Sequence, residues 1–462
     1  MPKITLITIE NYRGFYDARN ISPAQPNGNM GSGLTVLVGP NNSGKTSALN
    51  AFRLVLVPRQ VDLEHRHEGK MLSISLTNDA GQTKSVSNPD LGASLVPAGD
   101  QNAWPKADDF RIVPSRRSWA PYTGTQKVEQ GQYWQNYFTR DTREIEDPLF
   151  VSRIAGMSTD DRTKFDELLK KLLPQLNTWR IELSRGQTYI LYETKSGARH
   201  AADLFGDGMS SLFRVALALF DSREGYVVAI DEPELSLHPQ AQKSLADVLS
   251  QFSRDRQIII TTHSPYFVNW SDISSGAKIF RLTQEVGGVR VGCLKNSTVS
   301  DIERLIADWQ KPNLLDAVSR EVFFADEVLF LEGQEDVGLL RKFTEEKGLE
   351  ALPAFGYGAG GAANIRFFLR MAEDLGIPAA AIFDGDHAEM KLEVEREFPN
   401  SLVELLSAPD IRDKPRRDNR NRETDEVEKE GIFDRRGVIK PQYEEGLVNL
   451  LARISAFLTE RA

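Results

Sequence analysis

The stretch from Leu34 to Ser47, LTVLVGPNNSGKTS, most constrains what this chain can fold into. The apolar run Leu34–Val38 predicts a buried strand, and the residues after it read G-x-x-x-x-G-K-[ST] and lead into a helix. Glycines in such a turn let several backbone N–H groups point at one anion, and the helix N-terminus adds the positive end of its dipole. The segment therefore predicts a phosphate-binding loop.

Each part of this loop has an expected role. Lys45 would reach the outer phosphates of a bound nucleotide, and the Thr46 hydroxyl would bind Mg²⁺. A glycine-rich turn without a ligand is the alternative, and the correct flanks and spacing argue against it. The residues predicted to surround the nucleotide are Gly39, Asn41, Asn42, Ser43, Gly44, Lys45, Thr46 and Ser47.

Length and composition limit the class of protein. The chain has 462 residues, of which 26% are charged and 40% hydrophobic, and this composition predicts a globular protein of about two to four domains. The single cysteine, Cys293, excludes an intramolecular disulfide and fits a reducing cytosol. We see neither a signal peptide nor a membrane span, and we expect a cytoplasmic protein. The net charge of −10 means that any DNA binding would need a local groove or metal ions.

A second apolar strand ends in a pair of acidic residues. Residues 226–231, YVVAID, are followed by Glu232, which is a Walker B pattern. Asp231 would hold Mg²⁺ through water, and Glu232 would orient and deprotonate the attacking water. Residues 257–260, QIII, predict a further buried strand that leads to His263, which we expect to contact the γ-phosphate.

A glycine- and serine-rich turn precedes the Walker B strand. Residues 206–211, GDGMSS, open an apolar helix, and such a turn at a helix N-terminus can bind an anion. Taken alone, the pattern is more typical of a capped core helix. Its position directly before the Walker B strand favours a functional role.

Four motifs, in this order, resemble the ATPase heads of the ABC/SMC class: GPNNSGKTS, FGDGMSSL, AIDEPELSLHP and TTHSPYF. They match the P-loop, the signature turn, Walker B with its catalytic glutamate, and the switch histidine, although the turn lacks the usual leading Leu-Ser-Gly-Gly. The resemblance covers residues 1–295, with a helical or irregular insertion at about 60–200. It implies ATP and Mg²⁺ as cofactors, and a homodimer or higher homo-oligomer formed through the heads. Gly208 and Ser210 of one subunit would then act on the ATP of the other.

Beyond the head, the sequence predicts a second α/β module. Residues 296–322 are polar and helical and are interpreted as a connector. Residues 328–331 form an apolar strand that ends at Glu332, and residues 376–383 form another that ends in Asp384-Gly385-Asp386. With helices between them, these strands predict a parallel sheet with right-handed crossovers.

The acidic residues of this module fall at the carboxyl ends of its strands, where open α/β sheets bind ligands. Converging carboxylates repel one another unless a hard divalent cation neutralises them, and such a cation can activate water or stabilise charge on a phosphodiester. An acidic-x-acidic triplet alone arises by chance several times among 66 acidic residues in 462. Two such strand-end motifs about fifty residues apart together resemble a TOPRIM domain.

An ATPase head followed directly by TOPRIM resembles the OLD (overcoming lysogenization defect) family, ATP-regulated nucleases linked to phage defence. The resemblance implies a site for Mg²⁺ or Mn²⁺ at Glu332, Asp336, Asp384 and Asp386. It also implies an assisting lysine, for which Lys440 is chosen and Lys414 stays open. Residues 409–430 are interpreted as a solvated insertion, and contact of their arginines with a DNA backbone is the alternative.

The sequence thus predicts an α/β protein with an ABC-type P-loop head and a smaller parallel-sheet TOPRIM-like domain over residues 323–462. The main functional hypothesis is an ATP-dependent or ATP-regulated DNA endonuclease in anti-phage defence. One alternative is an ATPase sensor whose silent TOPRIM-like domain controls a separate effector protein. Another is a DNA clamp resembling SMC repair proteins, against which the missing coiled coil argues. The predicted catalytic residues are Glu232, His263, Glu332, Asp384, Asp386 and Lys440.

Overall fold

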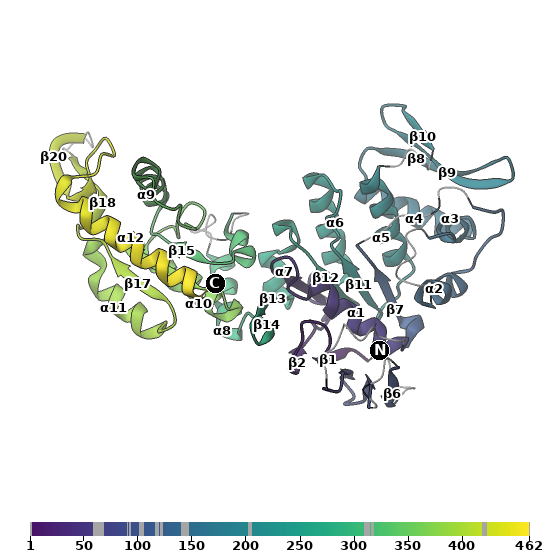
Figure 1. The fold of residues 1–462 in the computed structure, drawn as a ribbon. Coiled ribbons are helices and arrows are strands. Elements are labelled where there is room, and N and C mark those ends of the chain that lie inside the picture. Colours follow the sequence, from purple (N-terminus) through teal and green to yellow (C-terminus); the bar gives the residue numbers. More distant parts are fainter. Residues whose placement is uncertain are drawn as a thin grey trace. The chain divides into compact units, whose positions relative to one another are not determined.

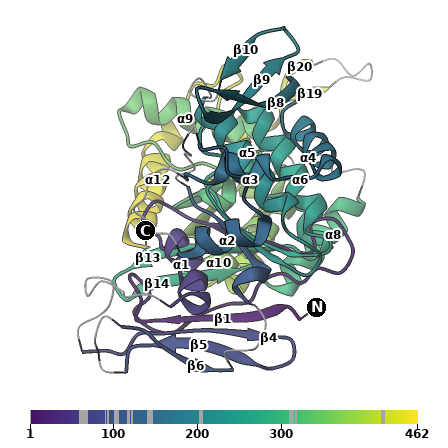
Figure 2. The same ribbon diagram turned by 90° about the vertical axis from the view of Figure 1, so that its right-hand side faces the viewer.

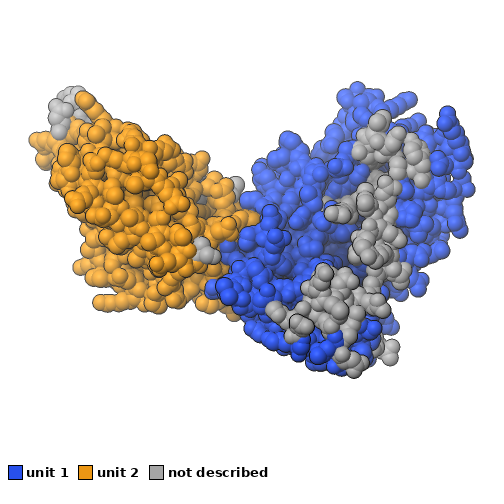
Figure 3. All heavy atoms as spheres, in the orientation of Figure 1, with its two compact units in different colours: residues 1–291 blue, residues 292–462 orange. Residues whose placement is uncertain are grey.

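The computed structural model describes the following residues: 2–58, 69–89, 91, 94–100, 106–115, 120, 123–139, 147–201, 206–308, 315, 318–417 and 423–461. The chain divides into two compact units, Met1–Val291 and Gly292–Ala462 (Figure 3). No helix in the described part of the chain is long and apolar enough to cross a membrane.

The first unit is built on a six-stranded sheet in the order β14-β13-β3-β12-β11-β7 (Figure 1). Strands β7, β11, β12, β3 and β13 run parallel to their neighbours. The central strands are buried along their whole length, which explains why their sequences are continuous apolar runs. The strands are β3 (Leu34–Val38), β7 (Phe110–Val113), β11 (Val227–Asp231), β12 (Gln257–Thr261), β13 (Lys278–Glu285) and β14 (Gly288–Cys293).

A five-stranded antiparallel sheet in the order β2-β1-β4-β5-β6 lies on the other side of α1 (Lys45–Leu56), which packs on strands of both sheets. Strands β1 and β2 form an N-terminal hairpin, with Ile7 paired to Ile21. The strands are β1 (Ile4–Glu10), β2 (Arg19–Ile21), β4 (Ser73–Asn78), β5 (Thr83–Ser87) and β6 (Val96–Gly99). Because β4 pairs directly with β1, the strands β4, β5 and β6 extend the N-terminal sheet.

Within residues 123–139 and 147–201, the structure describes three helices and a third sheet, β10-β9-β8. The turn between β8 and β9 has positive φ at Arg185 (50°) and Gly186 (73°), as a two-residue hairpin requires. Figures 1 and 2 show this sheet and the β1–β6 sheet at opposite ends of the first unit. The elements are α2 (Gln130–Thr139), α3 (Phe150–Ala155), α4 (Thr159–Leu172), β8 (Leu176–Ser184), β9 (Gln187–Thr194) and β10 (Arg199–Ala201).

Buried ion pairs attach this region to α5 (Asp207–Phe220), the helix that follows the glycine- and serine-rich turn. Arg214 on α5 pairs with Asp147, and Arg153 on α3 pairs with Asp221 at 2.6 Å. All four side chains are almost fully buried, so loss of one partner would leave an uncompensated charge in the interior. The other helices of the unit are α6 (Pro239–Phe252) and α7 (Trp270–Ser275), with 3₁₀ turns at Ala107–Asp109 and Pro265–Phe267.

The second unit contains the predicted parallel sheet, in the order β15-β16-β17. Its strands are β15 (Val328–Phe330), β16 (Ala379–Phe383) and β17 (Leu402–Leu405). Its main helices are α9 (Gln334–Lys347), α10 (Ala362–Leu375), α11 (Ala388–Glu397) and α12 (Pro441–Arg461), with 3₁₀ turns at Ser319–Phe324 and Gly385–His387. The α/β class with a second, smaller parallel sheet is therefore confirmed.

The charged stretch at residues 409–430 contains strands, which the solvated-insertion interpretation did not foresee. Strand β18 (Asp410–Arg412) pairs in parallel with β21 (Gly431–Phe433), and β19 (Lys414–Arg417) forms a hairpin with β20 (Glu423–Lys429). Arg416 of β19 forms an ion pair of 3.0 Å with Glu426 of β20. Cross-strand charge pairing of this kind supports a hairpin that has little apolar surface.

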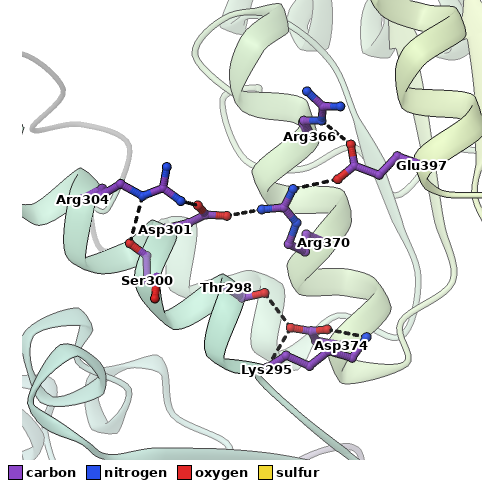
Figure 4. Close-up of polar contacts among 9 residues, drawn as sticks. All are labelled: Lys295, Thr298, Ser300, Asp301, Arg304, Arg366, Arg370, Asp374 and Glu397. Atoms are coloured by element: carbon purple, nitrogen blue, oxygen red, sulfur yellow. Dashed lines mark hydrogen bonds and ion pairs between the residues drawn. The ribbon is translucent and has the colours of Figure 1, made fainter.

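Helix α8 (Asn296–Ala307) opens the segment predicted as a connector, and it is attached to α10 inside the second unit (Figure 4). Asp374 of α10 is buried and accepts hydrogen bonds from the Lys295 backbone N–H (2.8 Å) and the Thr298 hydroxyl (2.6 Å). Arg370 of α10 bridges Asp301 of α8 and Glu397 of α11 (Figure 4). Residues 295–307 thus belong to the packed structure of the second unit.

We expect Asp374→Ala to destabilise the second unit by about 2 kcal/mol, because the buried Thr298 hydroxyl and the Lys295 N–H would lose their acceptor. The measurement is the midpoint of urea unfolding, monitored by far-UV circular dichroism. Glu393→Ala, on the exposed side of α11, is the matched control and should leave the midpoint unchanged. Equal midpoints for both variants would contradict the attachment of α8 to α10.

Two candidate active sites

The predicted phosphate-binding loop lies between β3 and α1. Gly39 (φ 138°) and Gly44 (φ 96°) adopt backbone angles that favour glycine, and a Cβ on Gly39 would approach the Leu282 carbonyl oxygen to 2.0 Å. Gly44 caps α1 without a side-chain hydrogen bond to the first backbone N–H groups of the helix. The first turn of α1 also contains no acidic side chain, so the positive end of its dipole is available to an anion.

Lys45 is buried inside this loop, with 5% of its surface exposed. Its ammonium group donates hydrogen bonds to the carbonyl oxygens of Gly39 (2.9 Å) and Pro40 (2.7 Å). Burial lowers the pKa of Lys45, and the nearby carboxylates of Glu232 and Asp231 act in the opposite direction. The lysine therefore ties the helix end of the loop to the backbone at its start, at Gly39 and Pro40. Of the other loop residues, Ser43 is buried, and Asn41 and Asn42 are exposed.

The Thr46 hydroxyl and the Asp231 carboxylate meet, although they are far apart in the sequence. Thr46 Oγ1 donates to Asp231 Oδ1 at 3.0 Å, and the Thr261 hydroxyl at the end of β12 donates to the same oxygen at 2.6 Å. A hydroxyl and a carboxylate are the hard oxygen donors that Mg²⁺ prefers. The donor chemistry at this point therefore fits the predicted Mg²⁺ site. Ser47, one residue further on, accepts a long hydrogen bond from Arg13 at 3.4 Å.

The predicted general base and the predicted switch histidine also come together. Glu232 has a positive φ of 49°, and its Oε1 lies 3.8 Å from His263 Nε2. Burial lowers the pKa of His263, and the charge of Lys45 lowers it further. Both effects favour the neutral imidazole, which has one donor nitrogen and one acceptor nitrogen.

Gly208, in the first turn of α5, lies against the chain that follows Walker B. A Cβ at Gly208 would lie 2.3 Å from the Ser236 carbonyl oxygen, and Ser236 itself has a strained φ of 61°. Gly208 and Ser210 are both half-buried in the single chain. Their action on the ATP of a partner subunit stays a prediction.

We expect Gly208→Ala to lower ATP turnover by about tenfold or more, because the Ser236 backbone would have to move away from the new methyl group. ATP binding should change little, since the loop around Lys45 is untouched. The assay compares phosphate release with the binding of a fluorescent ATP analogue. Gly206→Ala is the matched control, because a Cβ there would meet nothing within 4 Å. Equal ATP turnover in Gly208→Ala and Gly206→Ala would contradict a role in hydrolysis for the contact between Gly208 and Ser236.

In the second unit, the two strand-end acidic motifs meet. Glu332 lies two residues after the end of β15, and Asp384 directly follows β16. Glu332 Oε1 accepts hydrogen bonds from the Asp384 backbone N–H and from His387 Nδ1, each at 2.8 Å. The parallel pairing of β15 and β16 puts these residues at the same edge of the sheet, as the sequence predicted.

Burial and neighbouring negative charge shape the titration of this acidic cluster. Burial and then the carboxylate of Glu332 raise the pKa of Asp384 to about 8, with smaller contributions from Asp336, Asp410 and Asp386. Burial, opposed by the Gly333 N–H, raises the pKa of Asp336 to about 6. The donors are all hard oxygens with excess negative charge, so their chemistry fits a divalent cation. Among the residues that the structure describes, however, no three His, Cys, Asp or Glu side chains are arranged to hold a metal ion.

Cations of the chain itself lie beside these carboxylates. Lys429 of β20 pairs with Asp386 at 2.5 Å, and Lys414 of β19 pairs with Asp410 at 3.3 Å. Lys440, the chosen assisting lysine, instead pairs with Asp413 at 2.8 Å. Its catalytic role stays a prediction.

Sequence reasoning missed three members of this cluster. His387 follows Asp386 directly, and its contact with Glu332 makes it part of the site. Asp410 is the first residue of β18, so the rule that strand-end carboxylates converge could not find it. Lys429 lies in a run of charged residues, and the sequence does not distinguish it from its charged neighbours. Its position becomes apparent only in the β19–β20 hairpin.

The titration of Asp384 predicts how stability depends on pH without metal. Because its pKa is raised on folding, the folded chain binds more protons than the unfolded chain between about pH 4 and 8, and stability falls as pH rises through that range. Asp384→Asn removes this penalty, so in EDTA its melting temperature should exceed that of the wild type at pH 8.5 by a few degrees. At pH 4, where Asp384 is protonated in the folded chain, the difference should vanish. A constant difference at both pH values would contradict the assignment.

Three protein-family models match separate parts of the chain. Residues 2–90 match a family described as "AAA ATPase domain", and residues 99–269 match "AAA domain, putative AbiEii toxin, Type IV TA system". Residues 323–386 match "Overcoming lysogenization defect protein-like, TOPRIM domain". The chain therefore carries an ATPase-type domain followed by an OLD-like TOPRIM domain.

Curated relatives agree at low identity. The chain is 29% identical over 163 residues to the OLD nuclease of Thermus scotoductus, a match that covers 34% of this chain and 30% of that protein. It is 25% identical over 176 residues to the Old nuclease of Escherichia phage P2, covering 34% and 29%. It is 26% identical over 171 residues to the endonuclease GajA of Bacillus cereus, covering 31% and 25%. Each match thus spans less than a third of the relative's own length, and the chain is a distant relative of the OLD nucleases.

Solved SMC head domains also align with the chain. The head domain from Thermotoga maritima aligns with a TM-score of 0.38 and 15% identity, over 63% of this chain and 99% of that one. A head domain derived from Pyrococcus furiosus aligns with a TM-score of 0.47 and 14% identity, over 67% of this chain and all of that one.

Proposed function

We propose that this chain is an ATP-hydrolysing DNA endonuclease of the OLD type, in which the first unit hydrolyses ATP and the second cuts phosphodiester bonds. The observation that carries the proposal is that each unit gathers oxygen donors where neighbouring parallel strands end. In the first unit Asp231 ends β11 and meets Thr46 of α1, and in the second unit Glu332 and Asp384 meet just beyond the ends of β15 and β16. The OLD-like TOPRIM match over residues 323–386 supports the nuclease part.

In the first unit, the backbone N–H groups of the loop and Lys45 would bind the phosphates of ATP. Thr46 and Asp231 would hold Mg²⁺, which neutralises charge on the phosphate oxygens. Glu232 would accept a proton from the attacking water, and the neutral His263 would contact the γ-phosphate. Asn41, Asn42, Ser43 and Ser47 complete the predicted nucleotide surroundings.

In the second unit, Glu332, Asp384 and Asp386 would hold Mg²⁺ or Mn²⁺, with Asp336 close by. A bound divalent cation supplies an activated water and stabilises negative charge on the phosphodiester. Asp336 also accepts a hydrogen bond from the Gly333 N–H at 2.8 Å, so it fixes the start of α9 beside Glu332. Lys429, Lys414 or Lys440 would offset the charge of the DNA backbone.

The proposal includes a homodimer or higher homo-oligomer formed through the ATPase units, with Gly208 and Ser210 facing the partner's nucleotide. An anti-phage role for a cytoplasmic protein is the biological setting that the OLD resemblance suggests. The alternative function is an ATPase sensor whose second unit cuts nothing and controls a separate effector. Its support is that the described carboxylates do not form a ready set of metal ligands.

A plasmid assay separates the two functions. Purified protein is incubated with supercoiled plasmid and Mn²⁺, with and without ATP, and nicked product is measured beside phosphate release. Nicking that EDTA abolishes supports the nuclease. ATP turnover without nicking under any metal condition would replace the nuclease proposal by the sensor.

A further inference from the structure

Glu234 lies shortly after the aspartate that ends β11, and the proposed ATPase steps do not use it. The chain reverses sharply here, because Glu232 has a positive φ of 49° and Pro233 follows it. The Leu235 N–H closes this turn by donating to the Glu232 carbonyl oxygen at 3.1 Å. The reversal brings the Glu234 side chain to the end of the neighbouring strand β12.

The Glu234 carboxylate binds the backbone that carries His263. Its Oε1 accepts a hydrogen bond from the His263 N–H at 2.6 Å. The backbone carbonyl oxygen of Glu234 accepts a hydrogen bond from the Leu237 N–H at 2.9 Å, so the main chain of Glu234 is fixed as well. Burial raises the pKa of Glu234, and the hydrogen bond from His263 acts against that rise. The carboxylate is thus engaged with the strand end and is largely removed from solvent.

A second connection ties the same turn to β12. The Glu232 N–H donates to both the carbonyl oxygen and the hydroxyl oxygen of Thr261, each at 3.0 Å. The turn after β11 therefore contacts the last residue of β12, Thr261, and also His263, two residues beyond the end of that strand. Between these two connections, Glu232 Oε1 and His263 Nε2 face each other at 3.8 Å.

We infer that Glu234 is a positioning residue of the ATPase centre, whose carboxylate fixes the His263 backbone so that the imidazole stays beside Glu232. The inference rests on the proposed ATP hydrolysis. Without the Glu234 acceptor, Thr261 would still hold Glu232, but the backbone at His263 would lose its connection to the turn. Small displacements of a reacting group lower the chemical step more than they lower substrate binding.

The first test compares three substitutions of Glu234 in the full chain. Glu234→Ala and Glu234→Met, which keeps the volume, both lack an oxygen acceptor and should lower kcat by about tenfold, with the KM for ATP within about twofold of the wild type. Glu234→Gln keeps an Oε1 that can accept the His263 N–H and should retain kcat within about threefold. Glu224→Ala, at an exposed glutamate before β11, is the matched control.

The second test asks whether Glu234 acts through His263. In a His263→Ala background, adding Glu234→Ala should change kcat by less than about twofold, because the side chain it positions is already gone. Wild-type kcat in Glu234→Ala and Glu234→Met, failure of Glu234→Gln to restore turnover, or an undiminished effect without His263 would each overturn the inference. If the wild type hydrolysed ATP no faster than Lys45→Ala, the proposed ATPase activity itself would be wrong. That result differs from those that would contradict only the role of Glu234.

Discussion

Glu232→Gln is expected to lower ATP turnover by about 10²–10⁴-fold, the range that general bases contribute. Glutamine keeps the size of the side chain and its position near His263, but it cannot accept a proton from water at neutral pH. ATP binding should persist, because Lys45 and the loop remain intact. Phosphate release under saturating ATP measures turnover, and a fluorescent ATP analogue measures binding.

Two further variants bracket this prediction. Lys45→Ala should lose ATP binding as well as turnover, since the loop loses the side chain that reaches the phosphates. Glu224→Gln makes the same chemical change at an exposed position and should behave as the wild type. Normal turnover in Glu232→Gln would remove Glu232 from the catalytic role and leave the base to another residue.

Asp384→Ala is expected to reduce plasmid nicking to the level of a reaction without metal. Asp384 lies at the centre of the acidic cluster, where four other carboxylates influence its pKa. Its removal takes away both a donor oxygen and the charge that attracts a cation. Conversion of supercoiled plasmid to open circles in Mn²⁺ is the measurement.

The same variant shows whether the two centres can be separated. Asp384→Ala should retain ATP turnover, because the ATPase residues all lie in the first unit, Met1–Val291. Glu393→Ala, at an exposed position of α11, removes one carboxylate away from the cluster and should nick normally. Nicking that survives in Asp384→Ala but fails in Glu393→Ala would contradict the location of the nuclease site.

The elements around the phosphate-binding loop could be predicted from the sequence because buried parallel strands have no alternating polar face. β3, β11 and β12 are buried along their whole length; β3 leads into the glycine-rich loop, and β11 and β12 end in Asp231 and Thr261. The convergence of Thr46 with Asp231 follows from the order of these strands. Glu332 and Asp384 meet for the same reason in the second unit.

Elements whose stability comes from pairing were harder to predict. β4 alternates serine and threonine with apolar residues, and its side chains became interpretable only beside β1. The β19–β20 hairpin is almost entirely charged, and its cross-strand pairs are invisible to a pattern based on hydrophobicity. The polar, helical sequence of residues 296–322 suggested a connector, whereas Asp374 and Arg370 of α10 bind helix α8.

Glu234 illustrates a further limit. In the sequence DEPELSLHP it is one acidic residue after the two that the Walker B pattern explains. Its importance depends on a hydrogen bond to a backbone N–H on another strand, and no residue pattern encodes that bond. Glu232, with its positive φ of 49°, lies in the turn that brings Glu234 to this position.

The account depends most on a divalent cation at the acidic cluster of the second unit. Binding of Mn²⁺ to the nucleotide-free chain, followed by electron paramagnetic resonance, tests this claim without relying on any activity. The account predicts saturable Mn²⁺ binding in the wild type and in Lys45→Ala, and its loss in Asp384→Ala and Glu332→Gln. Equal Mn²⁺ binding by the wild type and Asp384→Ala, or none by either, would contradict it.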